Sequence, residues 1–370
     1  MPKILLILGT RPEAIKLSPV ILHFRCHRPE WSTRVCVTAQ HRGLLDQVLE
    51  VFGIRPDYDL DAMLPGQSLF QSTARMLTAL EPVLKQEKPD LVMVQGDTTT
   101  TLCGALAGFY GRVPVAHVEA GLRTGDLAQP FPEEMNRVLV SRVASVHCAP
   151  TRRAAENLLR EGLAPESVAI TGNPGIDAVF HVREQLRNGR LRPTVAVDPT
   201  RKLILVTAHR RESFGEGFEQ ICAALAALAA RPDVQIAYPV HPNPNVREPV
   251  YRHLRGRENV LLLEPLEYIS FVDLLSRAWM VLTDSGGIQE EAPSLGKPVL
   301  VMRNKTERPE AVQAGTARLV GSQTDTIVAE CGRLLDDPEA YQDMSRAHNP
   351  YGDGHASARI AEAVARFFKC

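Results

Sequence analysis

The sequence lacks any apolar run that could cross a membrane. Its most apolar helix-like stretch, ICAALAALAA (221–230), has ten residues, about half of a membrane span. The apolar run at the start, KILLILG (3–9), is short and is followed at once by Arg11 and Glu13, which differs from a signal peptide. We therefore expect a cytoplasmic protein with no membrane partner.

An excess of charge of either sign is also missing. The chain has 42 Lys and Arg residues against 43 Asp and Glu residues, and its formal net charge is -1. Proteins that bind nucleic acid normally carry a clustered basic surface, so we expect no nucleic-acid partner. Local charge is independent of the total, and this balance does not exclude a small anion site.

Cysteine pairs and metal-binding motifs are absent as well. The seven cysteines are scattered and none forms a CxxC pair, which is typical of free thiols in a reducing compartment. Cys36, Cys103 and Cys148 lie in apolar runs and are expected to fill the core. The sequence has no HExxH motif, no Cys/His cluster and no Asp-rich loop, so we expect no bound metal. No GxGxxG follows the first apolar run, which argues against NAD, and we expect no cofactor.

The sequence contains instead a series of short, continuous apolar runs. Twelve of them, from KILLILG (3–9) to ARLVG (317–321), alternate with helix-like stretches. Continuous rather than alternating hydrophobicity is typical of strands buried on both faces, in a parallel sheet with helices on either side. Twelve strands are too many for one open sheet, and 370 residues are more than one core usually serves. The sequence therefore predicts an α/β fold with two Rossmann-like doubly wound domains facing a cleft.

A weak internal sequence similarity, called the echo below, supports the division into two halves. KILLILGTRPE (3–13) and KLILVTAHRRE (202–212) share a lysine, an apolar strand and a polar turn with Arg and Glu. Chance similarity between two strand-and-turn segments would explain the echo equally well. The charged, proline-bearing segment 180–200 is the expected linker.

Several polar side chains fall just past the end of a predicted strand, where open α/β sheets bind ligands. They are Arg11, Gln40, Asp97, Glu119, His209, His241 and Ser285. In GTRPEAIK, Arg11 and Lys16 could reach one anion near a helix N-terminus; the alternative is a solvated helix face on which Glu13 pairs its neighbours. In QGDTTTT, Asp97 is either a site residue or a helix N-cap.

Two further acids belong to the segment HVEAGLRTGDLAQPFPEEMNR (117–137). Glu119 ends a buried strand, where an unpaired carboxylate is costly and usually has a reason. Glu133 follows Pro132 at a helix start, a position that also suits the helix dipole and needs no further role. With Asp97, these acids would give three carboxylates at one sheet end. Crowded carboxylates push pKa values apart, as general acid-base chemistry requires.

The segment DSGGIQEE (284–291) is the clearest candidate for a phosphate site. Ser285, Gly286 and Gly287 offer backbone amides and a hydroxyl at a helix start, with no side chain to obstruct approach. Glu291 lies about one turn further along and would reach sugar hydroxyls, and Arg308 supplies a further cation. The pattern indicates a nucleotide-sugar diphosphate as the ligand.

Two histidines follow predicted strands in the second half of the chain. His209 precedes Arg210 and Arg211, and a histidine beside cations could bind or protonate a phosphate. His241 lies in a loop rich in proline and asparagine, and a lone histidine of this kind is more often structural.

Taken together, these motifs resemble the non-hydrolysing UDP-N-acetylglucosamine 2-epimerases. The match runs through the chain in order and comprises GTRPEAIK, QHR, GDTTTT, HVEAGLRTGD, PEEMNR, HRRESFG, HPNPNVREP, DSGGIQEEAPSLGKPVL, TERPEA and NPYGDG. The resemblance implies a glycosyltransferase-B-like fold and a homodimer. We expect an N-terminal domain at 1–172, a UDP-binding domain at 173–354, and a C-terminal helix at 355–370 that packs back on the first domain.

The resemblance also implies the reaction and its residues. UDP-N-acetylglucosamine and UDP-N-acetylmannosamine would be interconverted at carbon 2 through loss and re-addition of UDP, without NAD or metal, in bacterial surface polysaccharide synthesis. Asp97, Glu119 and Glu133 match the family's acidic catalytic positions, and we group His209 with them. The substrate-binding positions are matched by Arg11 and Lys16 near the diphosphate, Ser285, Gly286 and Gly287 at the phosphates, Glu291 at the ribose, Arg308 at UDP and Phe271 beside the uracil.

A second site and two departures complete the comparison with the family. In some relatives the positions of Gln40, His41, Arg42 and His241 belong to a regulatory site for UDP-N-acetylglucosamine. Leu266 replaces a common glutamine, which would weaken base recognition if that contact used the side chain. Pro174 and Gly175 replace a more usual Thr-Val pair, which would alter the hinge.

Other functions stay open at this level, because a fold does not determine an activity. A glycosyltransferase on the same fold would need an acceptor pocket, and the three carboxylates argue against it. Further alternatives are an epimerase of a more decorated UDP-sugar, a hydrolysing relative that releases the free sugar, and a catalytically silent nucleotide-sugar sensor. The presence of Asp97, Glu119 and Glu133 disfavours the sensor.

Overall fold

The chain forms two compact units, each built on its own parallel sheet. The computed structural model describes residues 1–38, 42–64 and 66–369. Unit 1 comprises Met1–His181 together with Tyr351–Cys370, and unit 2 comprises Val182–Pro350. The boundaries therefore fall inside a helix and at Tyr351, whereas the sequence placed them at residues 172 and 354.

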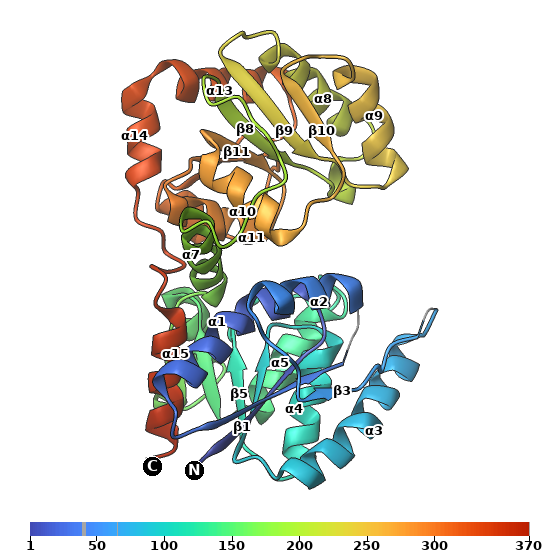
Figure 1. The fold of residues 1–370 in the computed structure, drawn as a ribbon, viewed down its shortest axis with the longest axis vertical. Coiled ribbons are helices and arrows are strands. Elements are labelled where there is room, and N and C mark those ends of the chain that lie inside the picture. Colours follow the sequence, from blue (N-terminus) through green and yellow to red (C-terminus); the bar gives the residue numbers. More distant parts are fainter. Residues whose placement is uncertain (39–41, 65, 370) are drawn as a thin grey trace. The chain divides into compact units, whose positions relative to one another are not determined.

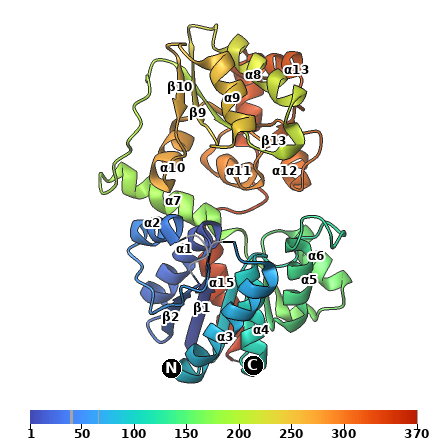
Figure 2. The ribbon, with the colours of Figure 1, turned by 90° about the vertical axis from the view of Figure 1, so that its right-hand side faces the viewer.

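The sheet of unit 1 has seven strands in the order β3-β2-β1-β4-β5-β6-β7, and every pair is parallel. The strands are β1 Lys3–Leu8, β2 Ser32–Val37, β3 Tyr58–Asp59, β4 Leu91–Gln95, β5 Val115–Val118, β6 Val146–Ala149 and β7 Val168–Ile170. Figure 2 shows α2 and α6 at opposite edges of this sheet.

Helices cover both faces of the first sheet. Helices α3, α4 and α5 pack side by side, and α1 packs against α2 and α15 (Figure 1). The helices are α1 Arg11–His27, α2 Arg42–Val51, α3 Leu69–Glu87, α4 Thr99–Tyr110, α5 Glu133–Val143, α6 Arg152–Arg160, α7 Pro174–Arg187 and α15 Ala356–Phe367, with a 3-10 turn at Pro165–Ser167. Side-chain caps fix several starts: Thr10 and Glu13 form a capping box at α1, and Ser68 and Gln71 form another at α3.

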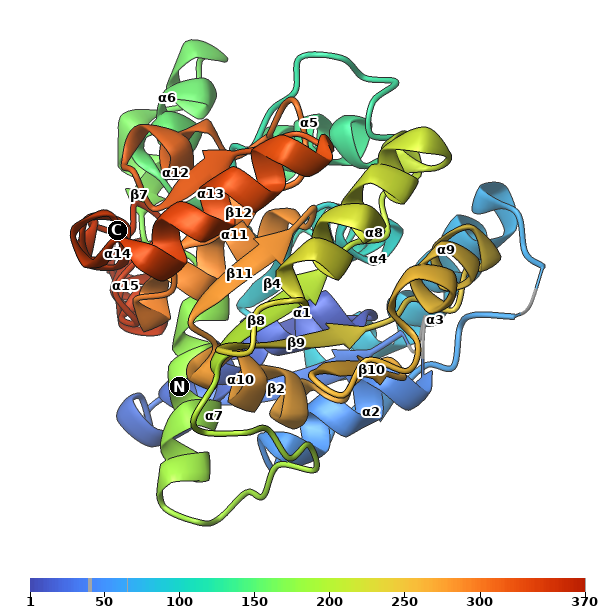
Figure 3. The ribbon, with the colours of Figure 1, turned by 90° about the horizontal axis from the view of Figure 1, so that it is seen from above.

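Unit 2 repeats the arrangement with six parallel strands in the order β10-β9-β8-β11-β12-β13, of which β10 to β12 can be followed in Figure 3. The strands are β8 Lys202–Thr207, β9 Val234–Pro239, β10 Val260–Leu263, β11 Met280–Thr283, β12 Val299–Val301 and β13 Ala317–Leu319. The helices are α8 Glu216–Leu228, α9 Pro244–Leu254, α10 Tyr268–Arg277, α11 Gly286–Glu291, α12 Pro309–Gln313, α13 Thr324–Asp336 and α14 Pro338–Arg346, with 3-10 turns at Arg211–Ser213 and Ala292–Leu295.

The prediction of two doubly wound α/β units is confirmed. Each of the twelve apolar runs contains a strand, and the central strands β1 and β8 are almost completely buried. The echo between residues 3–13 and 202–212 therefore marks equivalent strands of the two sheets. The sequence missed β3, a two-residue edge strand at Tyr58–Asp59, because it carries no apolar run. Cys36, Cys103 and Cys148 are core residues, and burial raises the pKa of each thiol to about 12.

Strand order reverses once in each sheet, and this positions the candidate site. In unit 1 the chain moves outward from β1 to β2 and β3, then returns to β4 on the other side of β1. In unit 2 the same reversal lies between β8 and β11. Loops diverge at such a switch point and leave room for a ligand beyond the carboxyl ends of the two strands. The turns after β1, β4, β8 and β11 therefore border the two switch points.

The start of α7 accommodates the unusual Pro174. Proline at the first helical position gives up an N–H that has no partner inside the helix. The side chain of Asn173 accepts a hydrogen bond from the Gly175 N–H at 2.8 Å, and the backbone N–H of Asn173 donates to the Tyr351 carbonyl at 2.7 Å.

Within the described residues, no helix is both long and apolar enough to span a membrane.

Candidate active site

The acid at the end of β5 is tied to Lys16. Glu119 is 8% exposed and has a left-handed backbone, with φ of 66°. The Lys16 ammonium donates to both of its carboxylate oxygens, at 2.5 and 2.6 Å. The side-chain amide of Gln95, the last residue of β4, also donates to Glu119. The sequence grouped Lys16 with Arg11 as an anion clamp, whereas here the ammonium of Lys16 binds Glu119 and Arg11 begins α1.

The second acid of this sheet edge, Asp97, is held by an arginine. Arg137 of α5 contacts the Oδ2 atom of Asp97 through Nε at 2.9 Å and through Nη2 at 2.7 Å. The Asn136 side chain donates to the Asp97 carbonyl at 2.7 Å, so α5 binds both the side chain and the backbone of Asp97. The alternative interpretation of Asp97 as a helix cap is wrong, because Thr98 caps α4.

Two adjacent glutamates at the start of α5 have different surroundings. Glu134 is 1% exposed and accepts hydrogen bonds from the Thr124 and Gly125 N–H groups, at 2.8 and 3.0 Å. It also binds Arg137 Nη1 at 2.8 Å. Glu133 is half-buried, and its side chain makes no hydrogen bond or ion pair within the part of the chain that the structure describes.

The electrostatics of this cluster follow from burial and charge. Burial opposes the charge of Glu134, but the Gly125 and Thr124 amides and Arg137 outweigh it and lower its pKa. Burial likewise opposes the charge of Arg137, but Asp97 and Glu134 together raise its pKa. The guanidinium is therefore a permanent cation that holds Asp97 in place.

In unit 2, the residue that organises the switch point is Asp284, directly after β11. It is 1% exposed, and its Oδ2 atom accepts hydrogen bonds from the backbone N–H groups of His209 and Arg210, at 2.6 and 2.7 Å. The His209 Nδ1 atom lies 3.4 Å from the other oxygen, an ion-pair distance. Asp284 thus joins the turn after β8 to the turn after β11.

The rings of His209 and His241 are stacked, with centroids 5.5 Å apart and an interplanar angle of 13°. Burial lowers the pKa of His209, Asp284 opposes that effect, and His241 and Arg210 add to it. His209 is therefore biased toward the neutral imidazole, which can accept a proton or donate one hydrogen bond. His241 is oriented in its loop, because its Nδ1 atom accepts the Asn243 N–H at 3.2 Å.

The glycine corner after Ser285 is open and is faced by Arg308. Ser285 caps α11 without a side-chain capping bond, and the first amides of α11 have no acceptor inside the helix. A methyl group on Gly286 would lie 3.7 Å from the Arg308 guanidinium. Arg308 is anchored by an ion pair with Glu290, which is 2% exposed.

Both glutamates of DSGGIQEE therefore have distinct surroundings. Glu290 points into the protein and binds Arg308, and its carbonyl accepts the Asn349 side-chain amide at 2.8 Å. Glu291 ends α11, and one of its carboxylate oxygens lies 3.8 Å from the position of a methyl group on Gly287. Glu291 is thus the acid on the open side of the corner.

Two of the remaining predicted residues lie at or near α10, and the others belong to the start of α2 or lie outside the described residues. Phe271 is half-buried on α10, and Leu266 is half-buried just before that helix. Gln40 and His41 lie outside the described residues. Arg42 begins α2, but its side chain is not described.

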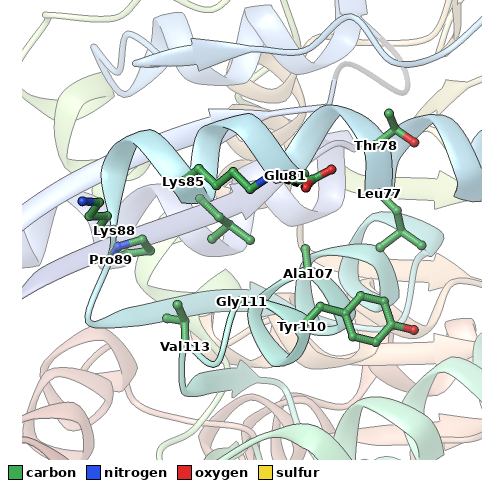
Figure 4. Close-up of a pocket in the computed structure, with 11 residues that line it drawn as sticks. Leu77, Thr78, Glu81, Lys85, Lys88, Pro89, Ala107, Tyr110, Gly111 and Val113 are labelled. Atoms are coloured by element: carbon green, nitrogen blue, oxygen red, sulfur yellow. Dashed lines mark hydrogen bonds and ion pairs between the residues drawn. The ribbon is translucent and has the colours of Figure 1, made fainter.

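A separate hollow of about 710 Å³ lies between α3 and α4 (Figure 4). Leu77, Leu84, Tyr110 and Val113 give it an apolar lining, and the Glu81–Lys85 ion pair of 2.6 Å borders it. These residues come from the second half of α3, the end of α4 and the loop before β5, near the amino edge of the sheet. The hollow is therefore far from the strand ends that carry Asp97 and Glu119.

Comparison with known proteins decides the family. The family model for UDP-N-acetylglucosamine 2-epimerase matches residues 25–365. A UDP-N-acetylglucosamine 2-epimerase of Escherichia coli K12 is 58% identical over 369 residues, covering 98% of each chain. The chain belongs to the UDP-N-acetylglucosamine 2-epimerase family. Members of this family are isomerases, and so is this protein.

Solved structures of other epimerases share the fold. The UDP-GlcNAc 2-epimerase of Neisseria meningitidis, solved with UDP-GlcNAc bound, is 48% identical with a TM-score of 0.89, covering 98% of this chain and 100% of that one. The enzyme of Methanocaldococcus jannaschii, in complex with UDP-GlcNAc and UDP, is 32% identical with a TM-score of 0.78, covering 98% and 99%. The glycosyltransferase-B-like fold of this epimerase is therefore established.

Sequence reasoning about this epimerase missed the residues that hold its candidate site side chains in place. Gln95, Glu134, Arg137, Asp284 and Glu290 were not singled out, although each lies in a quoted motif. Gln95 and Asp284 carried a signal as polar residues at strand ends, whereas Glu134, Arg137 and Glu290 lie on helices α5 and α11. What could not be read was which of two neighbouring acids, such as Glu133 and Glu134, points inward.

Proposed function

We propose that the protein interconverts UDP-N-acetylglucosamine and UDP-N-acetylmannosamine by eliminating UDP and adding it back. The observation that carries this proposal is the pair of carboxylates Asp97 and Glu119. They follow neighbouring strands β4 and β5, and each is held by its own cation, Arg137 or Lys16. Two oriented carboxylates beside a sheet edge are suited to moving a proton on and off one carbon atom.

The chemistry of the substrate explains why elimination is favoured. Carbon 2 bears an acetamido group and has no adjacent carbonyl, so removal of its proton alone would leave an unstabilised carbanion. If the bond from carbon 1 to the UDP oxygen breaks as the proton leaves, the electron pair forms the carbon 1–carbon 2 double bond. The products are 2-acetamidoglucal and UDP. Re-addition of UDP to carbon 1, with a proton delivered to the opposite face of carbon 2, gives the epimer.

The proposed roles divide between the two units. Asp97 and Glu119 act as base and acid at carbon 2, and Glu133 is assigned with them from the family resemblance. Arg11, Lys16 and His209 are assigned to the diphosphate; the neutral bias of His209 supports a hydrogen-bond or proton-transfer role at the departing phosphate.

A released glucal is a dead end, so the enzyme must retain UDP between elimination and re-addition. We assign this retention mainly to unit 2. The amides and hydroxyl of Ser285–Gly287 and the Arg308 guanidinium are assigned to the phosphates, which they suit as donors at a helix start. Glu291 is assigned to the ribose and Phe271 to the uracil. Asp284 would hold His209 beside this corner through its two backbone hydrogen bonds.

Three further expectations remain proposals. A homodimer and a place in bacterial surface polysaccharide synthesis are carried over from the family resemblance. A regulatory UDP-N-acetylglucosamine site would use His241 with Gln40, His41 and Arg42. The stacking of His241 on His209 supports a link between such a site and the phosphate residues.

Incubation of the purified protein with UDP-N-acetylglucosamine in heavy water tests the mechanism. We expect UDP-N-acetylmannosamine with deuterium at carbon 2, measured by NMR and mass spectrometry, and no requirement for added NAD. Epimer formed without deuterium would sink the elimination route. Free N-acetylmannosamine would indicate a hydrolysing enzyme, and UDP release only with an added acceptor would indicate a glycosyltransferase.

A further inference from the structure

A buried carboxylate that the proposed reaction does not use lies at the switch point of the unit 1 sheet, between the turns after β1 and β4. Glu13, in the first turn of α1, is 1% exposed. Its carboxylate accepts hydrogen bonds from the Gly9 and Thr10 backbone N–H groups and from the Thr98 and Thr101 hydroxyls. Such complete satisfaction is what a buried carboxylate needs.

The two oxygens of Glu13 serve different strands. Oε2 accepts the Gly9 and Thr10 N–H groups at 2.9 and 2.7 Å, which fixes the turn after β1. Oε1 accepts the hydroxyls of Thr98 and Thr101 at 2.6 and 3.1 Å, which fixes the start of α4 after β4. Because β1 and β4 flank the switch point, Glu13 joins the two turns across it.

From Glu13 the network reaches both carboxylates assigned to the reaction. Thr98 directly follows Asp97 in the chain. The Thr101 hydroxyl also lies 2.6 Å from the Gln95 carbonyl, and the Gln95 side-chain amide donates to Glu119. A shift of Glu13 would therefore reach Asp97 through Thr98. It would reach Glu119 through Thr101 and Gln95.

A capping role alone does not explain this arrangement. The capping box of α1 uses only Oε2 of Glu13 and the Thr10 N–H and hydroxyl. Burial raises the pKa of Glu13 against the effect of its hydrogen bonds, so the position costs free energy that an exposed capping glutamate would not. The turn cannot relax into free space either, since a methyl group on Gly9 would lie 2.1 Å from the Thr38 hydroxyl.

We infer that Glu13 is a positioning residue that holds Asp97 and Glu119 in reactive geometry. The inference rests on the proposed function. It also predicts which replacements are tolerated. Glutamine can keep the geometry, because its carbonyl accepts the two backbone N–H groups while its amide donates to the hydroxyls of Thr98 and Thr101. Alanine removes all of these bonds, and aspartate is one methylene too short to span both turns.

The test compares Glu13→Ala, Glu13→Asp and Glu13→Gln for kcat, KM and UDP affinity, the latter by calorimetry. We expect Glu13→Ala and Glu13→Asp to lower kcat by about 100-fold or more, as misplacement of catalytic groups by about 1 Å does. UDP affinity should fall less than kcat, because Arg308 and the glycine corner of unit 2 are unchanged. We expect Glu13→Gln to restore kcat to within about fivefold of wild type, because it keeps the geometry.

Two threonines of α4 provide a matched pair. Thr101→Val removes one hydroxyl bonded to Glu13 and should lower kcat by about tenfold. Thr100→Val removes a hydroxyl that is equally buried but bonds Thr38 at 2.9 Å, and should leave kcat within about twofold. Equal effects of the two variants would contradict the inference.

The outcomes separate this inference from the proposed function. An active wild type with an active Glu13→Ala variant would overturn the inference alone. Loss of turnover and UDP affinity in parallel with loss of folded protein, measured by circular dichroism, would reduce Glu13 to a structural residue. Wild-type protein that exchanges no deuterium at carbon 2 would remove the proposed function and the inference with it.

Discussion

At the scale of single residues, the groups that contact a carboxylate determine whether it is anchored or accessible. Asp97 and Glu119 are both held by cations, and Arg137, which binds Asp97, also binds Glu134. Glu133 and Glu134 are neighbours in sequence, but only Glu134 is enclosed by backbone amides. Identity and spacing therefore indicate that acids are present, and the surroundings distinguish an anchored acid from an accessible one.

We predict that Asp97→Asn loses turnover and keeps UDP binding. An amide cannot take the carbon 2 proton, so kcat should fall by roughly 10²–10⁴-fold, while the Kd for UDP should change by less than about threefold because Asp97 itself is assigned no contact with UDP. Initial epimerisation rates and calorimetry with UDP measure the two quantities. Asp343→Asn, on the exposed face of α14, is the control. Equal losses of turnover and binding would make Asp97 a binding residue.

At the scale of secondary-structure elements, strand ends are held together by a few buried polar groups. His117 of β5 is fully buried, and its Nε2 atom lies 2.7 Å from the Gly96 carbonyl after β4. Burial lowers its pKa from 6.5 to about 4, so the folded protein holds the ring neutral. His147 of β6 is also buried, and burial lowers its pKa as well.

The lowered pKa predicts a loss of stability in mild acid. The unfolded chain binds a proton at His117 below pH 6.5, while the folded chain does so only near pH 4, so stability is present above pH 6.5 and falls as the pH drops toward 4. This residue should account for roughly 2 kcal/mol of the loss between pH 7 and pH 5.

Urea unfolding of wild type and His117→Gln measures that loss. Glutamine keeps a donor for the Gly96 carbonyl and has no proton to gain, so the variant should show a correspondingly smaller drop between pH 7 and pH 5. His348→Gln, at an exposed position, should keep the wild-type pH dependence. The same pH dependence in wild type and His117→Gln would show that another group is responsible.

At the scale of the whole molecule, two units of the same architecture carry different chemistry. Both sheets have a switch point, and a buried acid joins the two turns at each one: Glu13 in unit 1 and Asp284 in unit 2. Unit 1 adds paired carboxylates, and unit 2 adds a glycine corner with Arg308. We therefore expect changes at the paired carboxylates to lower turnover more than UDP affinity, and changes at the glycine corner and Arg308 to lower UDP affinity.

The double change Glu290→Gln with Arg308→Gln tests the unit 2 half of this division. Removing Arg308 alone would strip buried Glu290 of its cation, so both partners are changed together. The Kd for UDP should rise about tenfold or more, since a hydrogen bond to a charged group contributes about 1.5–3 kcal/mol. Arg318→Gln, which breaks a surface pair with Glu330 of 3.0 Å, is the control. Unchanged UDP affinity in the double variant would exclude Arg308 from the phosphate site.

The sequence by itself determined the class of fold and the motifs of the site. Short continuous apolar runs that end in turn residues are typical of strands buried on both faces, so hydrophobicity predicts the two parallel sheets, apart from the short edge strand at Tyr58–Asp59. The positions of Asp97, Glu119 and Ser285 just past predicted strands indicated the candidate acids and the glycine corner, and the family resemblance implied their roles. These features are local along the chain, which is why sequence reasoning reaches them.

Only the tertiary structure decided how the acids are held. Lys16 meets Glu119 across 103 positions of sequence, Arg137 meets Asp97 across 40, and Asp284 meets His209 across 75. The tertiary structure also distinguished the buried Glu134 and Glu290 from their neighbours Glu133 and Glu291. It gave Glu13 its hydrogen bonds to the turns after β1 and β4. Such pairings depend on strand order and helix rotation, which bring distant segments together and aim one of two adjacent side chains inward.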